Sequence, residues 1–483
     1  MTVTTRTLAR TRHRRLARAG LALASAVVLA ATAAPAGAAP AWEPTTQVDI
    51  APDGARPDAP SWDIKISADG RTAVFSSGAR NLVPEHPKGG RHIYVRDLRG
   101  GRTELVSLAD DGTPLDGFTE FPTISADGRY VAFSTDAKNV LPGRTPEGLT
   151  NVYVRDRWTG RTELISAGTG ATDQSRFGAG TPAISQNGRY VVYTSNRTDI
   201  VTEESDGSDA AAANPSCCPP GTYNIYVADR WEGTTRLVTV GADGKPANSH
   251  SVDPVISADG RTIGFSSYAS NLLPAETAGT AATEAPAAQP ALDRAKFIPF
   301  YTYDLDEGTI SAGSTDTTGK PISADFDATI SPDGRYAVYT VPEAPGADGH
   351  HGYHTEVYVR DLREGTVRKA SVALPGTTTT GRSSHGTITA DDRWVYFESN
   401  AGNLVPGPQK ATDDIFRYDL RTGRTERVST APDGSLGNGY SSTPSVDAHG
   451  RTVVFASTSG NLVPGRNDPA DLYFHLYARE LGR

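Results

Sequence analysis

The stretch Ile124-Ser125-Ala126-Asp127-Gly128-Arg129-Tyr130-Val131-Ala132-Phe133-Ser134 decides the fold, because degraded copies of it recur along the chain. The seven copies begin at Ile66, Ile124, Ile184, Ile256, Ile330, Ile388 and Val446. Successive copies are 58, 60, 72, 74, 58 and 58 residues apart, so a basal unit of 58 residues carries insertions in its third and fourth intervals. Self-similarity of this kind indicates a repeat architecture.

Each unit predicts four short strands. A turn pair such as Asn187-Gly188 separates two apolar segments, which is the strongest short-range hairpin signal because the turn requires positive φ. A loop such as Asn81-Leu82-Val83-Pro84 follows, and then come a third strand (Ile93–Asp97) and a fourth (Thr103–Ser107). Four antiparallel strands form one propeller blade, so the sequence predicts an all-β, seven-bladed β-propeller.

The two ends of the repeat region predict how the ring closes. The seventh unit stops after a third strand, Leu472–Glu480, and therefore lacks its fourth strand. Residues Thr46–Ile50 match an isolated fourth strand placed before the first unit. We expect this N-terminal strand to complete the last blade, with the propeller over residues 46–483 and a linker over 39–45.

The repeated patterns SxDGRxVxFxS and YVRDLxTG resemble the WD-repeat-like blades of the TolB-like propeller family of bacterial exported proteins. The resemblance covers about residues 46–483 and implies the propeller fold. It is weak for function, because this fold is used by binding proteins, scaffolds and enzymes alike.

Residues 1–38 are predicted to be a signal peptide rather than part of the fold. Six arginines lie between Arg6 and Arg18, an apolar run covers Ala19–Ala34, and Ala36-Gly37-Ala38 fits a cleavage site. The run is shorter than the roughly 20 residues that span a bilayer. We therefore expect a secreted bacterial protein that is not an integral membrane protein. The pair Arg14-Arg15 leaves twin-arginine export open beside the general secretory route.

The charge of the chain restricts its partners. The full sequence has a net charge of −9, and loss of the six N-terminal arginines leaves 47 − 6 = 41 basic against 56 acidic residues, or −15. An acidic protein of this kind is not expected to bind nucleic acid, whose recognition depends on Lys and Arg contacts to phosphates. A cation, a basic peptide, a protein or a neutral glycan outside the cell or at its envelope remains possible, and solubility alone could explain the charge. We expect a monomer.

Three insertions predict the binding face. They cover Thr198–Thr222, Pro274–Ala295 and Pro342–Thr355, and each lies between a second and a third strand. In a propeller these loops share one face with the connections between blades, so the insertions gather there. Long loops on a rigid scaffold commonly carry binding function.

The repeat also aligns seven positions at the expected channel mouth. Three residues before each strand-opening Ile or Val stand Asp63, Phe121, Thr181, Asp253, Asp327, His385 and Thr443. From these positions and their neighbours we predict a ligand-binding set of His250, Asp253, Asp325, Asp327 and His385. A weaker prediction is a divalent-cation site at Asp63, Asp253, Asp327 and His385, since oxygen and imidazole ligands suit such ions. Alternatively, these side chains cap strand starts or surround a water-filled pore.

The adjacent pair Cys217 and Cys218 is a disulfide candidate in an oxidising compartment. Such a bond is strained, because a trans peptide holds the Cα atoms about 3.8 Å apart, below the usual range. Two free thiols or an intermolecular bridge are the alternatives.

Signatures of a nucleophilic or phosphate-binding enzyme are missing: the chain has no GxSxG elbow, no HExxH and no phosphate-binding glycine loop. The sequence therefore favours an exported binding or scaffold propeller that presents its long-loop face around an acidic channel mouth. The alternative is a metal-assisted carbohydrate-active lyase or hydrolase with its site at that mouth. A purely structural role in the cell envelope is a third possibility.

Overall fold

The computed structural model describes residues 44–85, 87, 90–141, 150–168, 178–197, 199–200, 221–274, 298–325, 327–343, 354–465 and 473–482. Residues 1–41 and 42–483 form separate units, and the second unit holds all the described strands. The predicted signal peptide and the cysteine pair Cys217-Cys218 lie outside the described residues. No helix in the described part of the chain is long and apolar enough to cross a membrane.

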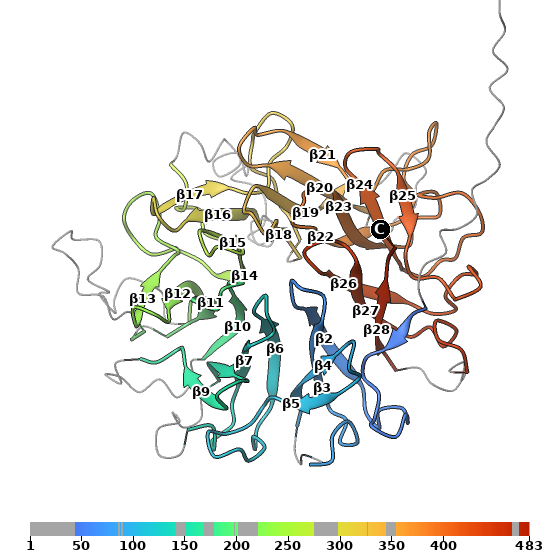
Figure 1. Ribbon diagram of the computed structural model, residues 1–483. Coiled ribbons are helices and arrows are strands. Elements are labelled where there is room, and N and C mark those ends of the chain that lie inside the picture. The colour runs from blue at the N-terminus through green and yellow to red at the C-terminus, as the bar shows by residue number, and fades with distance from the viewer. Residues whose placement is uncertain are drawn as a thin grey trace, which may run out of the picture. The chain divides into compact units, whose positions relative to one another are not determined.

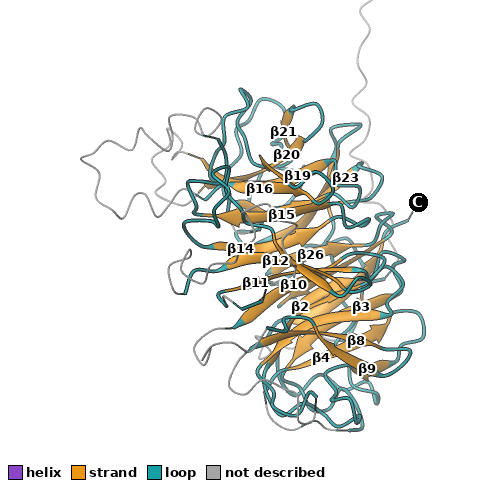
Figure 2. Cartoon of the chain, turned by 90° about the vertical axis from the view of Figure 1, so that its left-hand side faces the viewer, coloured by secondary structure: helices purple, strands orange, loops and turns teal. Residues whose placement is uncertain are grey.

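The described strands form seven four-stranded antiparallel sheets arranged around an axis, as Figure 1 shows. Figure 2 shows the same unit turned by 90°, with strands joined by loops and with no helix among the described residues. The expected seven-bladed propeller of four-stranded blades is confirmed.

The strands follow the repeat closely, and most have six residues. Blades 1 to 3 comprise β2 (Ser61–Ile66), β3 (Thr72–Ser77), β4 (His92–Asp97) and β5 (Thr103–Leu105); β6 (Thr119–Ile124), β7 (Tyr130–Thr135), β8 (Asn151–Asp156) and β9 (Arg161–Leu164); and β10 (Ala179–Ile184), β11 (Tyr190–Ser195), β12 (Asn224–Asp229) and β13 (Thr234–Leu237). Blades 4 and 5 comprise β14 (Ser251–Ile256), β15 (Thr262–Ser267), β16 (Phe300–Asp304) and β17 (Thr309–Ala312); and β18 (Thr329–Ile330), β19 (Tyr336–Glu343), β20 (His354–Asp361) and β21 (Val367–Lys369). Blades 6 and 7 comprise β22 (Ser383–Ile388), β23 (Trp394–Ser399), β24 (Asp414–Asp419) and β25 (Thr425–Arg427); and β26 (Ser441–Val446), β27 (Thr452–Ser457), β28 (His475–Glu480) and β1 (Thr46–Gln47).

The N-terminal strand closes the ring as expected. In β1, Thr46 pairs with Ala478 and Gln47 with Tyr477, both antiparallel. The ladder is shorter than the predicted Thr46–Ile50: beyond the bond from the Val48 amide to the Leu476 carbonyl, the next bond is made by the side chain of Asp49. Its Oδ1 accepts a hydrogen bond from the amide of Leu476 at 3.1 Å. The joint is therefore held by backbone and side-chain bonds together.

One packing device recurs in every blade. An aromatic residue in the second strand stacks on the aromatic residue paired with it in the third strand, with ring centroids 5.7 to 6.2 Å apart. The pairs are Phe75–Tyr94, Phe133–Tyr153, Tyr193–Tyr226, Phe265–Tyr301, Tyr339–Tyr358, Phe397–Phe416 and Phe455–Tyr477. Aromatic cross-strand pairs stabilise sheets beyond their buried area. The rigid frame that results holds the innermost strands in place around the axis.

Candidate functional site

A β-bulge in the innermost strands directs side chains toward the axis. The pairing of the first two strands shifts register in blades 1, 2, 3, 4, 6 and 7, for example between Val252 and Val255. Each bulge contains a non-glycine residue with φ between 43° and 54°: Asp63, Phe121, Thr181, Asp253, His385 and Thr443. Left-handed backbone at such residues costs on the order of 1–3 kcal/mol, and bulges of this kind re-aim side chains. These are the positions that the repeat alignment singled out.

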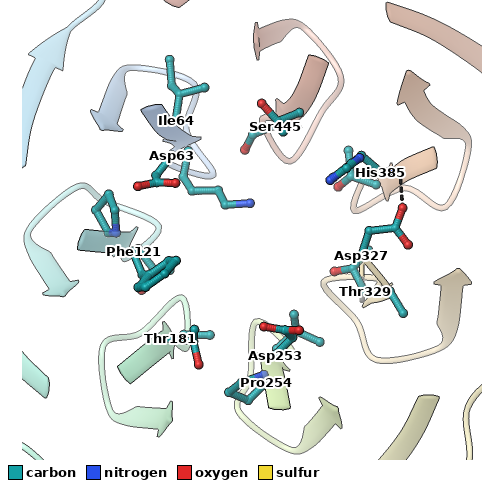
Figure 3. A pocket seen from close by; sticks show the side chains of 18 of the residues that line it. Asp63, Ile64, Phe121, Thr181, Asp253, Pro254, Asp327, Thr329, His385 and Ser445 are labelled. Carbon is teal, nitrogen blue, oxygen red and sulfur yellow. Dashed lines mark hydrogen bonds between the residues drawn. The ribbon is translucent and has the colours of Figure 1, made fainter. Parts of the chain in front are cut away.

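The bulges line an axial cavity of about 400 Å³. All seven aligned positions, including Asp327 of blade 5, contribute to its wall. Figure 3 looks into this cavity and shows the labelled side chains arranged around it, from Asp63 through Asp253 to His385. The first strands begin on the same side of the ring as the loops between second and third strands, since Ser251 pairs with Ser267 at the end of β15. The strand ends that bear the predicted insertions, such as Ser195 of β11 and Ser267 of β15, therefore lie on the side of the ring where the first strands begin. Most of the three insertions lies outside the described residues.

Hydrogen bonds hold four of the seven aligned side chains. In each case a residue near the end of the second strand bonds the aligned residue of its own blade. The bonds are Ser76 Oγ to Asp63 Oδ2 at 2.7 Å, Thr194 to Thr181 at 2.8 Å, Thr340 Oγ1 to Asp327 Oδ2 at 2.7 Å and Glu398 Oε1 with His385 Nδ1 at 3.0 Å. The side chains at the mouth are thus preorganised rather than free in solvent.

Asp63 is neutralised by a neighbouring cation. Arg91 Nη1 lies 3.6 Å from Asp63 Oδ2 and 2.9 Å from Glu120 Oε1, and its guanidinium covers the ring of Trp62 at 4.1 Å. This arginine serves two carboxylates, so Asp63 has little capacity left for a cationic ligand.

Asp253 departs from the pattern. Among the described residues its carboxylate has no hydrogen-bond or ion-pair partner. Ser266 nevertheless occupies the position from which Ser76 and Thr340 donate to Asp63 and Asp327 in their own blades. Burial raises the pKa of Asp253 to about 6. A half-buried carboxylate without a counter-ion is costly to ionise, and an opposite charge placed next to it would recover that cost.

His385, Asp327 and Asp325 form a cluster at the adjoining blades 5 and 6. The backbone N–H of His385 donates to Asp327 Oδ2, while Asp327 Oδ1 is buried without a hydrogen bond. Burial alone would lower the pKa of His385, but the hydrogen bond and charge of Glu398 outweigh burial and raise it. Burial and the charge of Asp327 raise the pKa of Asp325, and His385 opposes them.

Lys65 is the basic residue of the cavity wall, two positions after Asp63. Its side chain is exposed to solvent at the cavity. Asp253, Asp325 and Asp327 thus share the cavity and its rim with one ammonium group, while Phe121, 43% exposed, adds an aromatic surface. The chemistry of the mouth favours an organic cation, which carboxylates and aromatic faces both attract.

Neither the predicted ligand-binding set nor the predicted metal-binding set comes together in full. His250 does not line the cavity; its Nδ1 accepts a hydrogen bond from the amide of Tyr223 at 3.2 Å, and the two rings lie 5.7 Å apart. The predicted metal ligands come from four different blades, and only Asp327 and His385 are in contact. Within the described ranges, no three His, Cys, Asp or Glu side chains are grouped closely enough to hold a metal ion.

Two residues of the site were missed from the sequence. Glu398 stands where the other second strands have Ser76, Ser134, Thr194, Ser266, Thr340 and Ala456. This single acid in a column of small residues was a detectable signal in the repeat alignment. Lys65 gave no comparable signal in the sequence. Only the bulge between Trp62 and Lys65 brings Lys65 to the cavity that Asp63 also lines.

The chain resembles known proteins at the level of structure. No protein-family model matches it, and no curated protein sequence does. Among solved structures it is similar to oligogalacturonate lyase from Vibrio parahaemolyticus, with a TM-score of 0.50 and 13% identity over 92% of this chain and 99% of the other. The β-propeller domain of the trilobed protease from Pyrococcus furiosus has a TM-score of 0.48, 12% identity and coverage of 88% and 94%. TolB from Acinetobacter baumannii has a TM-score of 0.34, 15% identity and coverage of 86% and 78%. The likeness to the oligogalacturonate lyase shows the β-propeller fold alone.

Proposed function

We propose that this protein is an exported, monomeric binding propeller of the TolB-like kind, which takes a basic group of a peptide or protein partner into the mouth of its axial cavity. The carboxylate of Asp253 is the observation that carries the proposal. It faces the cavity, has no bonding partner among the described residues, and has its pKa raised to about 6 by burial. A guanidinium or ammonium group would supply the missing counter-charge.

Three further features support a cationic ligand. Besides Asp63, which is paired with Arg91, the cavity and its rim carry the acids Asp253, Asp325 and Asp327 against the one ammonium of Lys65. Phe121 exposes an aromatic face that attracts cations. The bulges hold the site open before any ligand binds, so little ordering cost remains to be met on association. The basic start and apolar run of residues 1–38 support export.

The proposal is tested with a short labelled peptide containing two arginines and with the same peptide carrying citrulline in both places. Fluorescence anisotropy should show binding of the arginine peptide only. The variant D253N should weaken binding about tenfold or more, since a hydrogen bond to a charged group contributes about 1.5–3 kcal/mol.

A matched control uses the same blade and the same change of charge. Asp306 lies on the opposite face and its side chain is 68% exposed, so D306N should leave peptide affinity unchanged. Equal affinity of the wild type and D253N, or binding of the citrulline peptide as tight as that of the arginine peptide, would refute the proposal.

The His385–Glu398 pair favours a second candidate, a carbohydrate-active lyase. Glu398, 5% exposed, bonds Nδ1 of His385 at 3.0 Å and so orients its ring, which leaves Nε2 of the imidazole for acid–base chemistry. In such a reaction the base removes a proton next to a uronate carboxyl, the bond to the leaving oxygen breaks, and a carbon–carbon double bond forms. Ultraviolet absorbance of unsaturated products from polygalacturonate, lost in H385A, would support this candidate; unchanged absorbance with the wild type would dismiss it.

A further inference from the structure

Two tryptophans are exposed on the face opposite the cavity mouth. Trp158 and Trp231 are 67% and 64% exposed and occupy equivalent positions in the turns between the third and fourth strands of blades 2 and 3. The equivalent turn residues of blades 1, 4, 5 and 6 are charged: Arg99, Asp306, Arg363 and Arg421. Large exposed apolar rings are costly to maintain without use, and two on neighbouring blades form a distinct surface.

Both indoles are held in place by the same arrangement. The guanidinium of Arg129 lies 4.7 Å from the ring centroid of Trp158 and 4.7 Å from that of Tyr130, and it bonds both carboxylate oxygens of Asp156 at 3.0 and 2.7 Å. In the next blade, the guanidinium of Arg189 takes the same role, 5.1 Å from the ring centroid of Trp231 and 4.9 Å from that of Tyr190. It also bonds both carboxylate oxygens of Asp229. Each ring is therefore supported by a cation while most of its surface stays open to solvent.

A groove of about 610 Å³ lies beside the turn that carries Trp158 and extends to Arg230 of the next blade; neither tryptophan lines it. Asp156 and Thr159 come from the turn that carries Trp158, and Arg230 precedes Trp231 in the other turn. Arg161 and Glu163 of β9 complete its polar wall. The groove thus offers hydrogen-bond donors and acceptors beside the exposed aromatic rings.

Basic and acidic groups are balanced around the groove. Besides the Arg129–Asp156 and Arg189–Asp229 pairs, Arg230 Nε lies 3.0 Å from Glu163 Oε2, and Arg189 Nη2 lies 3.6 Å from Glu232 Oε1. With Arg161, four arginines face four carboxylates, so the surface presents polar atoms without a net charge to attract an ion. An uncharged ligand rich in hydroxyl groups matches this arrangement.

We propose that Trp158, Trp231 and the adjacent groove form a binding surface for a neutral polysaccharide. Flat aromatic rings held rigidly at the surface stack on the C–H faces of sugar rings. Guanidinium and carboxylate groups beside them form hydrogen bonds with the sugar hydroxyls. This surface is independent of the cavity mouth, so the protein would link a glycan on one face to a basic partner on the other.

Native gel electrophoresis through soluble polysaccharides tests the proposal. The probes are hydroxyethyl cellulose, arabinoxylan, pullulan and laminarin, with polygalacturonate as an acidic comparison. At least one neutral polysaccharide should retard the wild type. W158A and W231A should each weaken that retardation, and the double variant should lower affinity at least tenfold.

The control is Y440A, which removes an aromatic residue that is 48% exposed on the opposite face and should keep the wild-type retardation. Thermal unfolding of all variants checks that they remain folded. Failure of all four neutral polysaccharides to retard the wild type would overturn the proposal. Retardation by polygalacturonate alone, or equal retardation of wild type and the double variant, would overturn it as well.

Discussion

At the scale of single residues, the site depends on side chains in left-handed backbone. Thr181 and Thr443, with φ of 43° and 50°, are β-branched, and such residues rarely adopt this conformation. The ring tolerates the strain because each bulge is fixed by two flanking stretches of the hairpin ladder. Strained residues concentrated around one cavity indicate that the position of these side chains matters more than their local stability.

Asp253 makes a prediction about stability. Its folded-state pKa of about 6 lies above its ordinary value, so the folded protein binds this proton more tightly than the unfolded chain does. Stability from this group is present below about pH 4 and is lost as pH rises through about 6. D253N should therefore be more stable than the wild type by about 1–3 kcal/mol at pH 8 and equal to it at pH 4. Urea unfolding at both pH values checks this, and a less stable D253N at pH 8 would contradict it.

At the scale of elements, one hairpin turn departs from the repeat. Asp392 stands where the other first turns have glycine, as Gly128 in the second blade, and it takes a φ of 55°. Its Oδ1 is buried without a hydrogen bond, and burial, with the charge of Asp333, raises its pKa to about 6. Both backbone strain and a poorly solvated carboxylate thus reside in this turn.

D392G should stabilise the protein at pH 7, because glycine removes a left-handed cost of about 1–2 kcal/mol that exceeds its own entropic penalty of about 0.5–1 kcal/mol. Loss of the carboxylate adds to this gain. The variant D392N keeps the side chain and removes the charge, so comparison of the three thermal midpoints separates strain from charge. A midpoint of D392G below that of the wild type would show that the turn needs its aspartate.

The strands were predictable from the sequence because each repeat carries its turn residues and its alternation at the same spacing. The seven aligned positions were found for the same reason, and the structure brings all of them to one cavity. The orientation of His250 toward Tyr223 depends on the path of a connection that no repeat position specifies. The partner of a bulge residue, such as Glu398 for His385, is set by the register shift, which the hydrophobic pattern does not encode.

At the scale of the whole molecule, stability depends on a joint between the two ends of the propeller. Val48 is 1% exposed, and its amide donates to the carbonyl of Leu476 at 2.7 Å. Arg479 Nε donates to Thr45 Oγ1 at 2.7 Å, and the carboxylate of Asp49 is fully buried at the joint. Removal of this strand would leave the edge of β28 unpaired and apolar.

A chain that begins at Ala51 should therefore unfold at lower temperature than one that begins at Pro44, and it should self-associate through the open edge of β28. Differential scanning calorimetry and light scattering of the two proteins make the comparison. Identical unfolding temperatures for both would mean that the seventh blade does not need its N-terminal strand.

The central claim is that the ionised carboxylate of Asp253 binds a cation at the mouth of the axial cavity. Calorimetric titration with the two-arginine peptide between pH 5 and pH 8 tests it most directly. The account predicts that wild-type affinity rises through about pH 6, as Asp253 loses its proton, and that D253N shows a weaker affinity without this rise. An affinity that does not change across this pH range in the wild type, or the same rise in D253N, would contradict the claim.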